Sequence, residues 1–292
     1  MGPADFPRIV CIENTNHCDA SCIMCPREKL TRGQGIMRFD LFRKIVDECS
    51  GYNIKGMSLY GFGEPFLDPG FIEKIRYAKD KGIENVYVST NGYSLTKEKC
   101  REVISSGLDK IGISFYGKDK KEYEAVFRTL NYETTLQNIR NFIEEKRRAK
   151  SRKPLLYIKG LRHCQVGPSS ARFFGYPVRE IFHLPDIGFR LRWRRHAKTR
   201  MQGGERWRGW VHEKDCAGVR HPAAGRDACN DVCDRMVQIL WNGDVVPCNC
   251  DFDGTLKFGN VSGTEIASIW NRKEYKRFRE IKNYNNALNE IM

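Results

Sequence analysis

Short apolar runs recur along the first half of the chain, and each is followed by a polar or glycine-rich stretch. Their richness in Val, Ile, Leu and Tyr predicts β-strands. Nearly every position in them is apolar, which is typical of strands that are covered by other elements. The runs are RIVCIE at 8–13, GMSLY at 56–60, NVYVST at 85–90, KIGISFY at 110–116 and PLLYIKGL at 154–161.

Between these runs, apolar residues recur every three or four positions, as on one face of an α-helix. Strands that alternate with helices predict an α/β protein with a parallel sheet, either open and doubly wound or closed into a full or partial barrel. In both cases functional residues gather at the carboxyl ends of the strands. The apolar stripes are Phe39, Phe42, Ile45, Val46 and Cys49; Cys100, Val103, Ile104 and Leu108; and Leu136, Ile139 and Ile143.

The pattern breaks between residues 162 and 235, where neither a strand nor a helix period persists. This stretch holds 13 Arg and 2 Lys against 8 acidic residues, so it contributes +7 of the formal net charge of +14. A long basic loop is one interpretation. Interleaved Arg and Trp also suit a strip that stacks on single-stranded nucleic acid. A translated frameshift is a third interpretation. The genetic code allows residues 162–167 to be encoded as CGC CAT TGT CAA GTC GGA, which reads Ala-Ile-Val-Lys-Ser when the frame moves by one nucleotide.

Regular patterning returns near residue 236. VQILW and DVVPC predict a hairpin around the turn dipeptide Asn242-Gly243. The stretch SIWNRKEYKRFREI at 268–281 then predicts one basic amphipathic helix.

Length and cysteine content limit the class of protein. A chain of 292 residues can bury a large core, and it has neither an 18-residue apolar run nor a secretory signal pattern. We therefore expect a cytoplasmic protein whose 12 cysteines are not structural disulfides. Cys11, Cys49 and Cys100 lie among apolar residues and are predicted to be core side chains.

Three further cysteines, Cys18, Cys22 and Cys25, are spaced C-x3-C-x2-C directly after the first predicted strand. Together with His17 they would make a zinc site, although structural zinc sites favour paired cysteines at both ends. Three thiolates can also hold a four-iron cluster and leave one iron open to a ligand.

The stretch IENTNHCDASCIMCPR resembles the cluster motif of radical S-adenosylmethionine (SAM) enzymes. The sequence YGFGEPFLDP after the second strand resembles their Gly-Gly-Glu-Pro motif. The resemblance implies a partial (β/α)6 TIM-like barrel over residues 7–161, with its last strand in the irregular segment 162–228. It implies that Cys18, Cys22 and Cys25 bind a 4Fe–4S cluster.

The same resemblance assigns cofactor-binding residues. Gly61, Gly63 and Pro65 would shape the backbone around SAM, and the Glu64 carboxylate would accept from the methionine amino group. Asn91, which follows the third predicted strand, and Ser114, near the end of the fourth, are candidates for contacts to its ribose and carboxylate. Asn91-Gly92 is equally a plain turn, and Ser114 is equally a helix cap.

Residues 229–292 resemble a SPASM or twitch extension, which binds auxiliary iron–sulfur clusters. Because no thiol follows Cys250, we expect this extension to be truncated. The candidate auxiliary ligands are Cys229, Cys233, Cys248 and Cys250.

The implied activity is reductive cleavage of SAM to a 5′-deoxyadenosyl radical, which abstracts hydrogen from a peptide- or sugar-like substrate. The resemblance implies a flavodoxin- or ferredoxin-like electron donor, and we expect no nucleic-acid or membrane partner. An RNA-modifying enzyme of the same chemistry and a catalytically silent metal-binding remnant are the alternatives.

Overall fold

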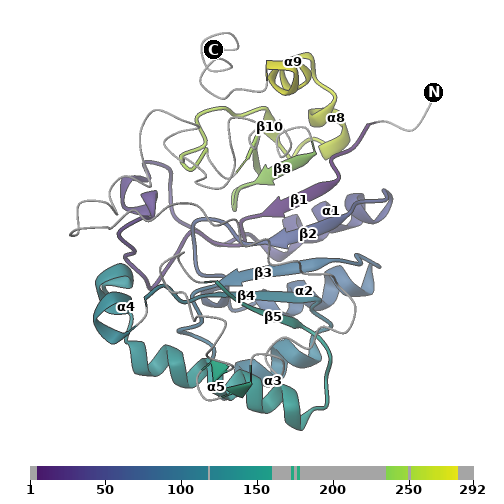
Figure 1. Ribbon diagram of the computed structural model, residues 1–292. Coiled ribbons are helices and arrows are strands. Elements are labelled where there is room, and N and C mark those ends of the chain that lie inside the picture. Colours follow the sequence, from purple (N-terminus) through teal and green to yellow (C-terminus); the bar gives the residue numbers. More distant parts are fainter. Residues whose placement is uncertain are drawn as a thin grey trace, which may run out of the picture.

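The computed structural model describes residues 5–117, 119–159, 235–248 and 251–281, together with two short paired strands (Figure 1). These two are β6, Arg172–Phe173, and β7, Tyr176–Pro177. The expectations for Cys229, Cys233 and Cys250, and those for the remainder of 162–228, lie outside these residues.

One sheet of eight strands runs through the described chain, in the order β10-β9-β8-β1-β2-β3-β4-β5. The five strands predicted in the first half are confirmed, and neighbouring strands among them are parallel. Their bounds are β1 Ile9–Ile12, β2 Gly56–Leu59, β3 Val86–Thr90, β4 Lys110–Ser114 and β5 Leu155–Lys159.

Helices follow the strands in βα order, as the periodicity predicted. Several begin at a side-chain cap that accepts a backbone N–H; for example, Thr96, Asp119 and Asn131 cap α3, α4 and α5. The helices are α1 Phe39–Ser50, α2 Phe71–Asp80, α3 Lys97–Ser105, α4 Lys120–Phe127 and α5 Tyr132–Arg148, with short 3-10 helices η1 Pro26–Lys29 and η2 Pro65–Leu67.

The two faces of the parallel sheet differ in burial. In β3, Val86, Val88 and Thr90 are buried, whereas the intervening Tyr87 and Ser89 are partly exposed. Successive side chains of a strand point to opposite faces, so one face forms the core and the other carries partly exposed polar groups. Cys11, Cys49 and Cys100 are buried in the core, as predicted.

The predicted hairpin at Asn242-Gly243 is present, as β8 Met236–Ile239 and β9 Asp244–Val246. β8 pairs with β1 in parallel, so the hairpin extends the sheet of the N-terminal half, and β10, Gly259–Asn260, pairs with β9. The described part of the C-terminal region is therefore built directly onto the first strand (Figure 1).

The prediction of one helix over 268–281 is wrong, because the structure has α8, Ile266–Trp270, and α9, Lys273–Ile281. The Asn271 side chain ends α8 by donating to the carbonyl oxygens of Ala267 at 2.9 Å and Asp5 at 2.7 Å. This break allows Trp270, Tyr275 and Phe278 all to be buried. No described helix is long and apolar enough to cross a membrane.

Candidate active site at the carboxyl ends of the strands

The three motif cysteines lie on the loop that leaves β1 and leads into η1. Each is half-buried, none is in a disulfide, and the Cys25 N–H donates to the Cys22 carbonyl at 3.0 Å. Burial raises the pKa of the Cys18 thiol to about 12. Burial also raises the pKa of Cys22, and the charges of the neighbouring Cys25 and Cys18 would raise it further.

Asp19 holds this loop against the end of β3. Its carboxylate accepts from the side-chain amide of Asn91 at 2.6 Å and from the Ser94 hydroxyl at 3.0 Å. The Thr129 hydroxyl donates to the Asp19 carbonyl at 2.7 Å, which ties the loop to the segment after α4. The cysteine loop is thus fixed at two places, and Asn91 is one of its anchors.

Glu64 is fully buried between the second and third strands. One carboxylate oxygen accepts from the Thr90 hydroxyl at 2.6 Å and the Phe66 N–H at 3.2 Å, and the other accepts from the Asn91 N–H at 2.7 Å. Burial raises the pKa of Glu64 to about 7, against the lowering effect of these donors. A carboxylate has about four acceptor positions, so one remains for the predicted methionine ammonium.

Glycine is required at both motif positions because the chain that follows β1 passes very close to them. A Cβ on Gly61 would lie 2.5 Å from Cγ of Glu13, and a Cβ on Gly63 would overlap the carbonyl oxygen of Thr15. The Glu64 N–H also donates to the His17 carbonyl at 2.8 Å. Pro65 then begins η2 and is buried. These contacts bring the Gly-rich loop and the cysteine loop together.

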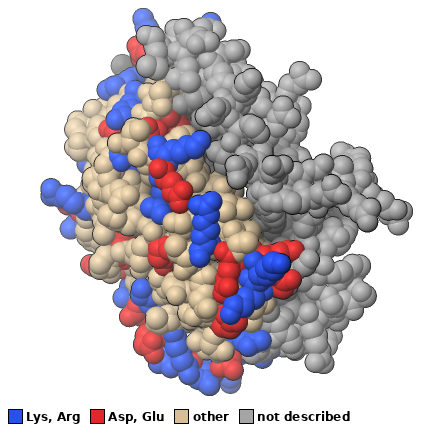
Figure 2. Space-filling model, turned by 90° about the vertical axis from the view of Figure 1, so that its left-hand side faces the viewer, with Lys and Arg blue, Asp and Glu red and all other residues tan. Residues whose placement is uncertain are grey.

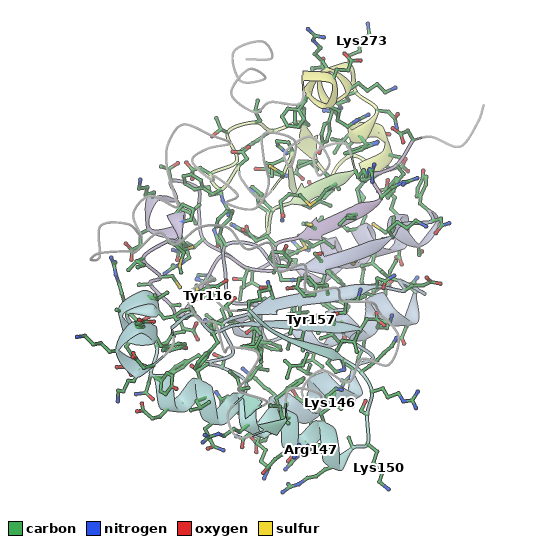
Figure 3. The ribbon with its side chains drawn as sticks, viewed as in Figure 1. Tyr116, Lys146, Arg147, Lys150, Tyr157 and Lys273 are labelled. Atoms are coloured by element: carbon green, nitrogen blue, oxygen red, sulfur yellow. The ribbon has the colours of Figure 1, made fainter. Side chains whose placement is uncertain are left out.

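Ser114 ends β4 on the face that carries the partly exposed polar groups. It pairs in register with Lys159 at the end of β5. The structure therefore places Ser114 at the same edge of the sheet as Asn91 and Glu64, and its contact with a cofactor stays a prediction. Tyr116 lies just beyond this edge and stacks on Phe127 of α4, whereas Tyr157 lies within β5 (Figure 3).

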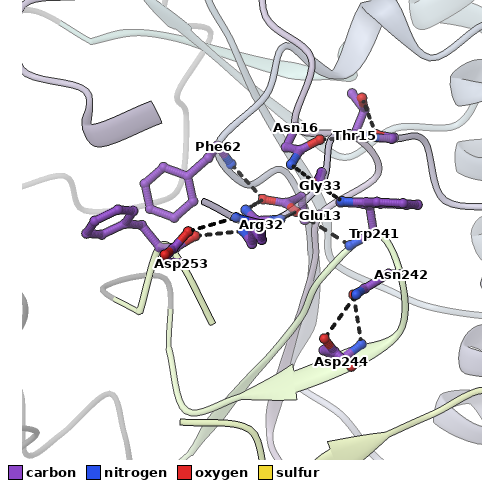
Figure 4. Close-up of polar contacts among 12 residues, drawn as sticks. Glu13, Thr15, Asn16, Arg32, Gly33, Phe62, Trp241, Asn242, Asp244 and Asp253 are labelled. Carbon is purple, nitrogen blue, oxygen red and sulfur yellow. Dashed lines mark hydrogen bonds and ion pairs between the residues drawn. The ribbon is translucent and has the colours of Figure 1, made fainter. Parts of the chain in front are cut away.

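A buried ion pair beneath these loops was not predicted from the sequence. The Arg32 guanidinium binds the Glu13 carboxylate in bidentate fashion, at 2.6 and 2.7 Å (Figure 4). Glu13 also accepts from the N–H of Phe62 at 3.1 Å and of Trp241 at 3.4 Å. Asp253 accepts from the Arg32 N–H at 3.2 Å. The cysteine loop, the Gly-rich loop and the C-terminal hairpin therefore meet at one carboxylate.

Of the candidate auxiliary ligands, the structure describes Cys248. Its side chain is buried just after β9, and its charge would raise the pKa of Cys11 in β1. Cys248 therefore lies near the junction of β8 and β1.

Three thiols on one loop are a donor set that suits an iron–sulfur cluster. Within the described ranges, no three Cys, His, Asp or Glu side chains are grouped to hold one ion, including Cys18, Cys22 and Cys25 with His17. A four-iron cube instead presents a different iron to each thiolate, so its ligands need not converge on one point. Thiolates are the usual ligands of such clusters.

Two protein families match the chain. Residues 12–157 match the Radical SAM superfamily, and residues 229–290 match SPASM, an iron–sulfur cluster-binding domain.

Among curated proteins, the chain is 24% identical to the tungsten-containing aldehyde ferredoxin oxidoreductase cofactor-modifying protein of Pyrococcus furiosus, covering 94% of this chain and 83% of that protein. It is 32% identical to a probable GTP 3′,8-cyclase of Pyrococcus horikoshii, over 39% of this chain and 36% of the cyclase.

The fold is also similar to solved structures. BtrN in complex with AdoMet and 2-DOIA matches with a TM-score of 0.58 and 15% identity, over 97% of this chain and 90% of BtrN. Streptococcus suis SuiB bound to S-adenosylmethionine matches with a TM-score of 0.64 and 15% identity, over 94% of this chain and 68% of SuiB. At these identities the likeness concerns the fold, which is the expected partial barrel with a C-terminal subdomain.

Proposed function

Because the chain belongs to the radical SAM superfamily, we propose that Cys18, Cys22 and Cys25 hold a 4Fe–4S cluster that cleaves SAM and starts hydrogen abstraction from a small-molecule or peptide substrate. Membership implies an enzyme that uses this cluster and SAM. The SPASM match implies auxiliary iron–sulfur clusters. The residue assignments, the substrate and the electron donor are our proposals.

One observation carries the assignment of the site. Three half-buried thiols share a loop at the carboxyl end of β1, and Asp19 anchors this loop to the same Asn91 whose N–H binds Glu64. Ligands bind at this edge in parallel α/β folds. The motif cysteines and the Gly-rich loop thus form one connected structure.

The protein residues have positioning roles in this proposal. When bound, the cluster supplies the electron that divides SAM into methionine and a 5′-deoxyadenosyl radical. The open acceptor position of Glu64 would take the methionine ammonium, and the backbone at Gly61 and Gly63 would approach SAM closely. The Asn91 side chain donates to Asp19 and accepts from the Tyr93 N–H at 2.8 Å. We therefore propose that Asn91 mainly orients the loop.

Hydrogen abstraction needs a substrate C–H held near the radical and sheltered from water. We assign no acid–base triad, and we propose that the polar face formed by β2, β3, β4 and β5 holds the substrate. Tyr60, Tyr87, Ser89 and Tyr157 are partly exposed there. Their hydroxyl groups suit a polar substrate such as a sugar or a peptide.

The names of similar proteins cover several kinds of substrate. The Pyrococcus furiosus relative, which aligns with 94% of the chain, is named for modifying a cofactor. BtrN was solved with 2-DOIA, and SuiB was also solved with its precursor peptide SuiA. A peptide- or sugar-like substrate remains our proposal.

We propose a flavodoxin- or ferredoxin-like donor and no nucleic-acid partner. Figure 2 looks onto the side where β1–β5 end, and basic and acidic side chains are interspersed over its described surface. A nucleic-acid site would need a coherent basic strip. A cytoplasmic location is proposed from the cysteine content alone. Cys229, Cys233, Cys248 and Cys250 are proposed auxiliary ligands.

The test is formation of 5′-deoxyadenosine by anaerobically reconstituted protein, measured by mass spectrometry with dithionite and SAM. We expect the nucleoside from the wild type and none from Cys22→Ala, while Cys49→Ala, a buried cysteine of α1, keeps the activity. Full cluster loading without any 5′-deoxyadenosine would favour the catalytically silent alternative.

A further inference from the structure

Lys159 occupies an unusual position at the carboxyl edge of the sheet. It is the last residue of β5 and pairs in register with Ser114. Its ammonium donates to the Ser89 hydroxyl of β3 at 2.8 Å, so the side chain reaches across β4. The amine is thereby held on the polar face of the sheet.

Aromatic rings surround this amine. Its nitrogen lies 5.2 Å from the ring centre of Tyr87 and 5.7 Å from that of Tyr60, and the two rings pack edge to face. Such rings stabilise a cation through their negative faces. They also leave the ammonium with unused donors, since it has three and Ser89 accepts one.

The strand that Lys159 crosses is shaped to admit it. Gly112 lies in β4 between Ser89 and Tyr157, and a Cβ there would be 2.7 Å from Cε of Lys159 and would overlap the Tyr87 hydroxyl. Any larger residue at this position would displace the lysine. The position of the Lys159 side chain therefore depends on glycine at 112.

Lys159 has no carboxylate partner among the residues that the structure describes. Lys74, the buried lysine of α2, is by contrast paired with Asp68 at 2.6 Å. Burial lowers the pKa of Lys159, and the nearby Tyr116 partly offsets this. A cation that is withdrawn from water gains most from an anionic partner.

We propose that Lys159, supported by Ser89, binds an oxyanion, the carboxylate or phosphate group of a ligand on the polar face of the sheet. The inference rests on the proposed function, because the ligand is either SAM, through its carboxylate, or the substrate. Tyr60 directly precedes the Gly61 loop, so the anion would lie beside the proposed SAM site. In the second case the substrate is an acidic molecule.

The test follows the Lys159 amine itself in the reconstituted full chain. Lysine labelled with 13C at Cε is incorporated during expression, which leaves all three N–H donors of the ammonium intact, and the Lys159 NMR signal is assigned by its loss in Lys159→Gln. The signal is then titrated with acetate, with inorganic phosphate and with SAM. We expect the pKa of Lys159 to rise when the anion binds.

Calorimetry with the same probes gives the size of the effect. Loss of a charge-assisted hydrogen bond predicts binding that is weaker by about tenfold to a hundredfold in Lys159→Gln. Lys159→Arg keeps the cation and should retain binding. Lys110→Gln removes a lysine at the opposite end of β4 and should change nothing.

The two sources give different results. If phosphate or acetate shifts the Lys159 signal while SAM is already bound, the anion site belongs to the substrate. If SAM by itself shifts the signal fully, and phosphate or acetate adds nothing, the anion site belongs to the cofactor. If no probe moves the Lys159 signal although the protein forms 5′-deoxyadenosine, the inference is overturned and the proposed function stands. Anion binding by a protein that makes no 5′-deoxyadenosine would instead overturn the proposed function alone.

Discussion

The ion pair between Glu13 and Arg32 gives the sharpest stability prediction. Glu13 is completely buried and the Arg32 side chain is 10% exposed, so neither charge has water as an alternative partner. Arg32→Met leaves the Glu13 carboxylate buried with only the N–H groups of Phe62 and Trp241. We therefore expect the native state to lose stability.

Breaking a buried pair by removing one partner costs about 3–5 kcal/mol. A loss of 1 kcal/mol lowers the melting temperature of a domain of this size by about 2–4 °C, so we expect Tm to fall by about 10 °C. Circular dichroism during urea and thermal unfolding, at equal cluster loading, measures both quantities.

Two variants distinguish the loss of the buried ion pair from a nonspecific effect of substitution. Glu13→Gln combined with Arg32→Met removes the stranded charge and keeps an acceptor for Phe62, so it should recover part of the loss. Arg38→Met removes an arginine whose exposed pair with Asp40 should contribute little. A loss below about 1 kcal/mol in Arg32→Met, or an equal loss in Arg38→Met, would show that the buried pair does not stabilise the fold in this way.

Three further predictions concern the site. Burial raises the pKa of Glu64 from 4.5 to about 7. Protonation of Glu64 therefore stabilises the folded, cluster-free protein. This contribution to the free energy of unfolding is complete below pH 4.5 and is lost as the pH rises through 7. The change is about 3 kcal/mol, and urea titrations should show it abolished in Glu64→Gln. Asp19→Ala should release iron to a chelator severalfold faster than wild type, whereas Asp80→Ala at the end of α2 should not; equal rates would disprove the anchoring role. Cys248→Ala should lower the iron content and leave the formation of 5′-deoxyadenosine from SAM measurable; unchanged iron would remove Cys248 from the ligand set.

The parts of the fold with strong local patterns were predictable from the sequence. Dense β-branched and aromatic residues predicted the five strands of the first half. The turn dipeptide Asn242-Gly243 predicted the hairpin. The three clustered cysteines marked the candidate site because such spacing has few structural explanations. These signals all lie within a few consecutive residues.

Long-range features could not be read in this way. β8 pairs with β1 in parallel although more than 220 residues separate them, and parallel pairing leaves no turn signature between the strands. In the sequence, Glu13 is an ordinary polar residue at the end of a predicted strand, and its partner Arg32 lies beyond the cysteine loop. Likewise, the break at Asn271 depends on a bond to Asp5 near the other end of the chain.

Lys159 illustrates a signal that the sequence contained in part. A lysine ends a strand whose other positions are mostly apolar, and Gly112 interrupts the neighbouring strand. Each is unremarkable alone, because strands often end in a charged residue. Their relation became visible only when the register placed Lys159 beside Ser114 and its amine on Ser89.

In the proposed site, three thiolates hold a cluster with one iron open to SAM. Electron paramagnetic resonance of the dithionite-reduced protein, recorded with and without SAM, reports on that open iron. We expect a 4Fe–4S signal that changes when SAM is added and whose SAM-responsive part is absent from Cys22→Ala. A protein that binds zinc in place of iron, or a SAM-responsive signal that persists without Cys18, Cys22 and Cys25, would contradict the proposed site.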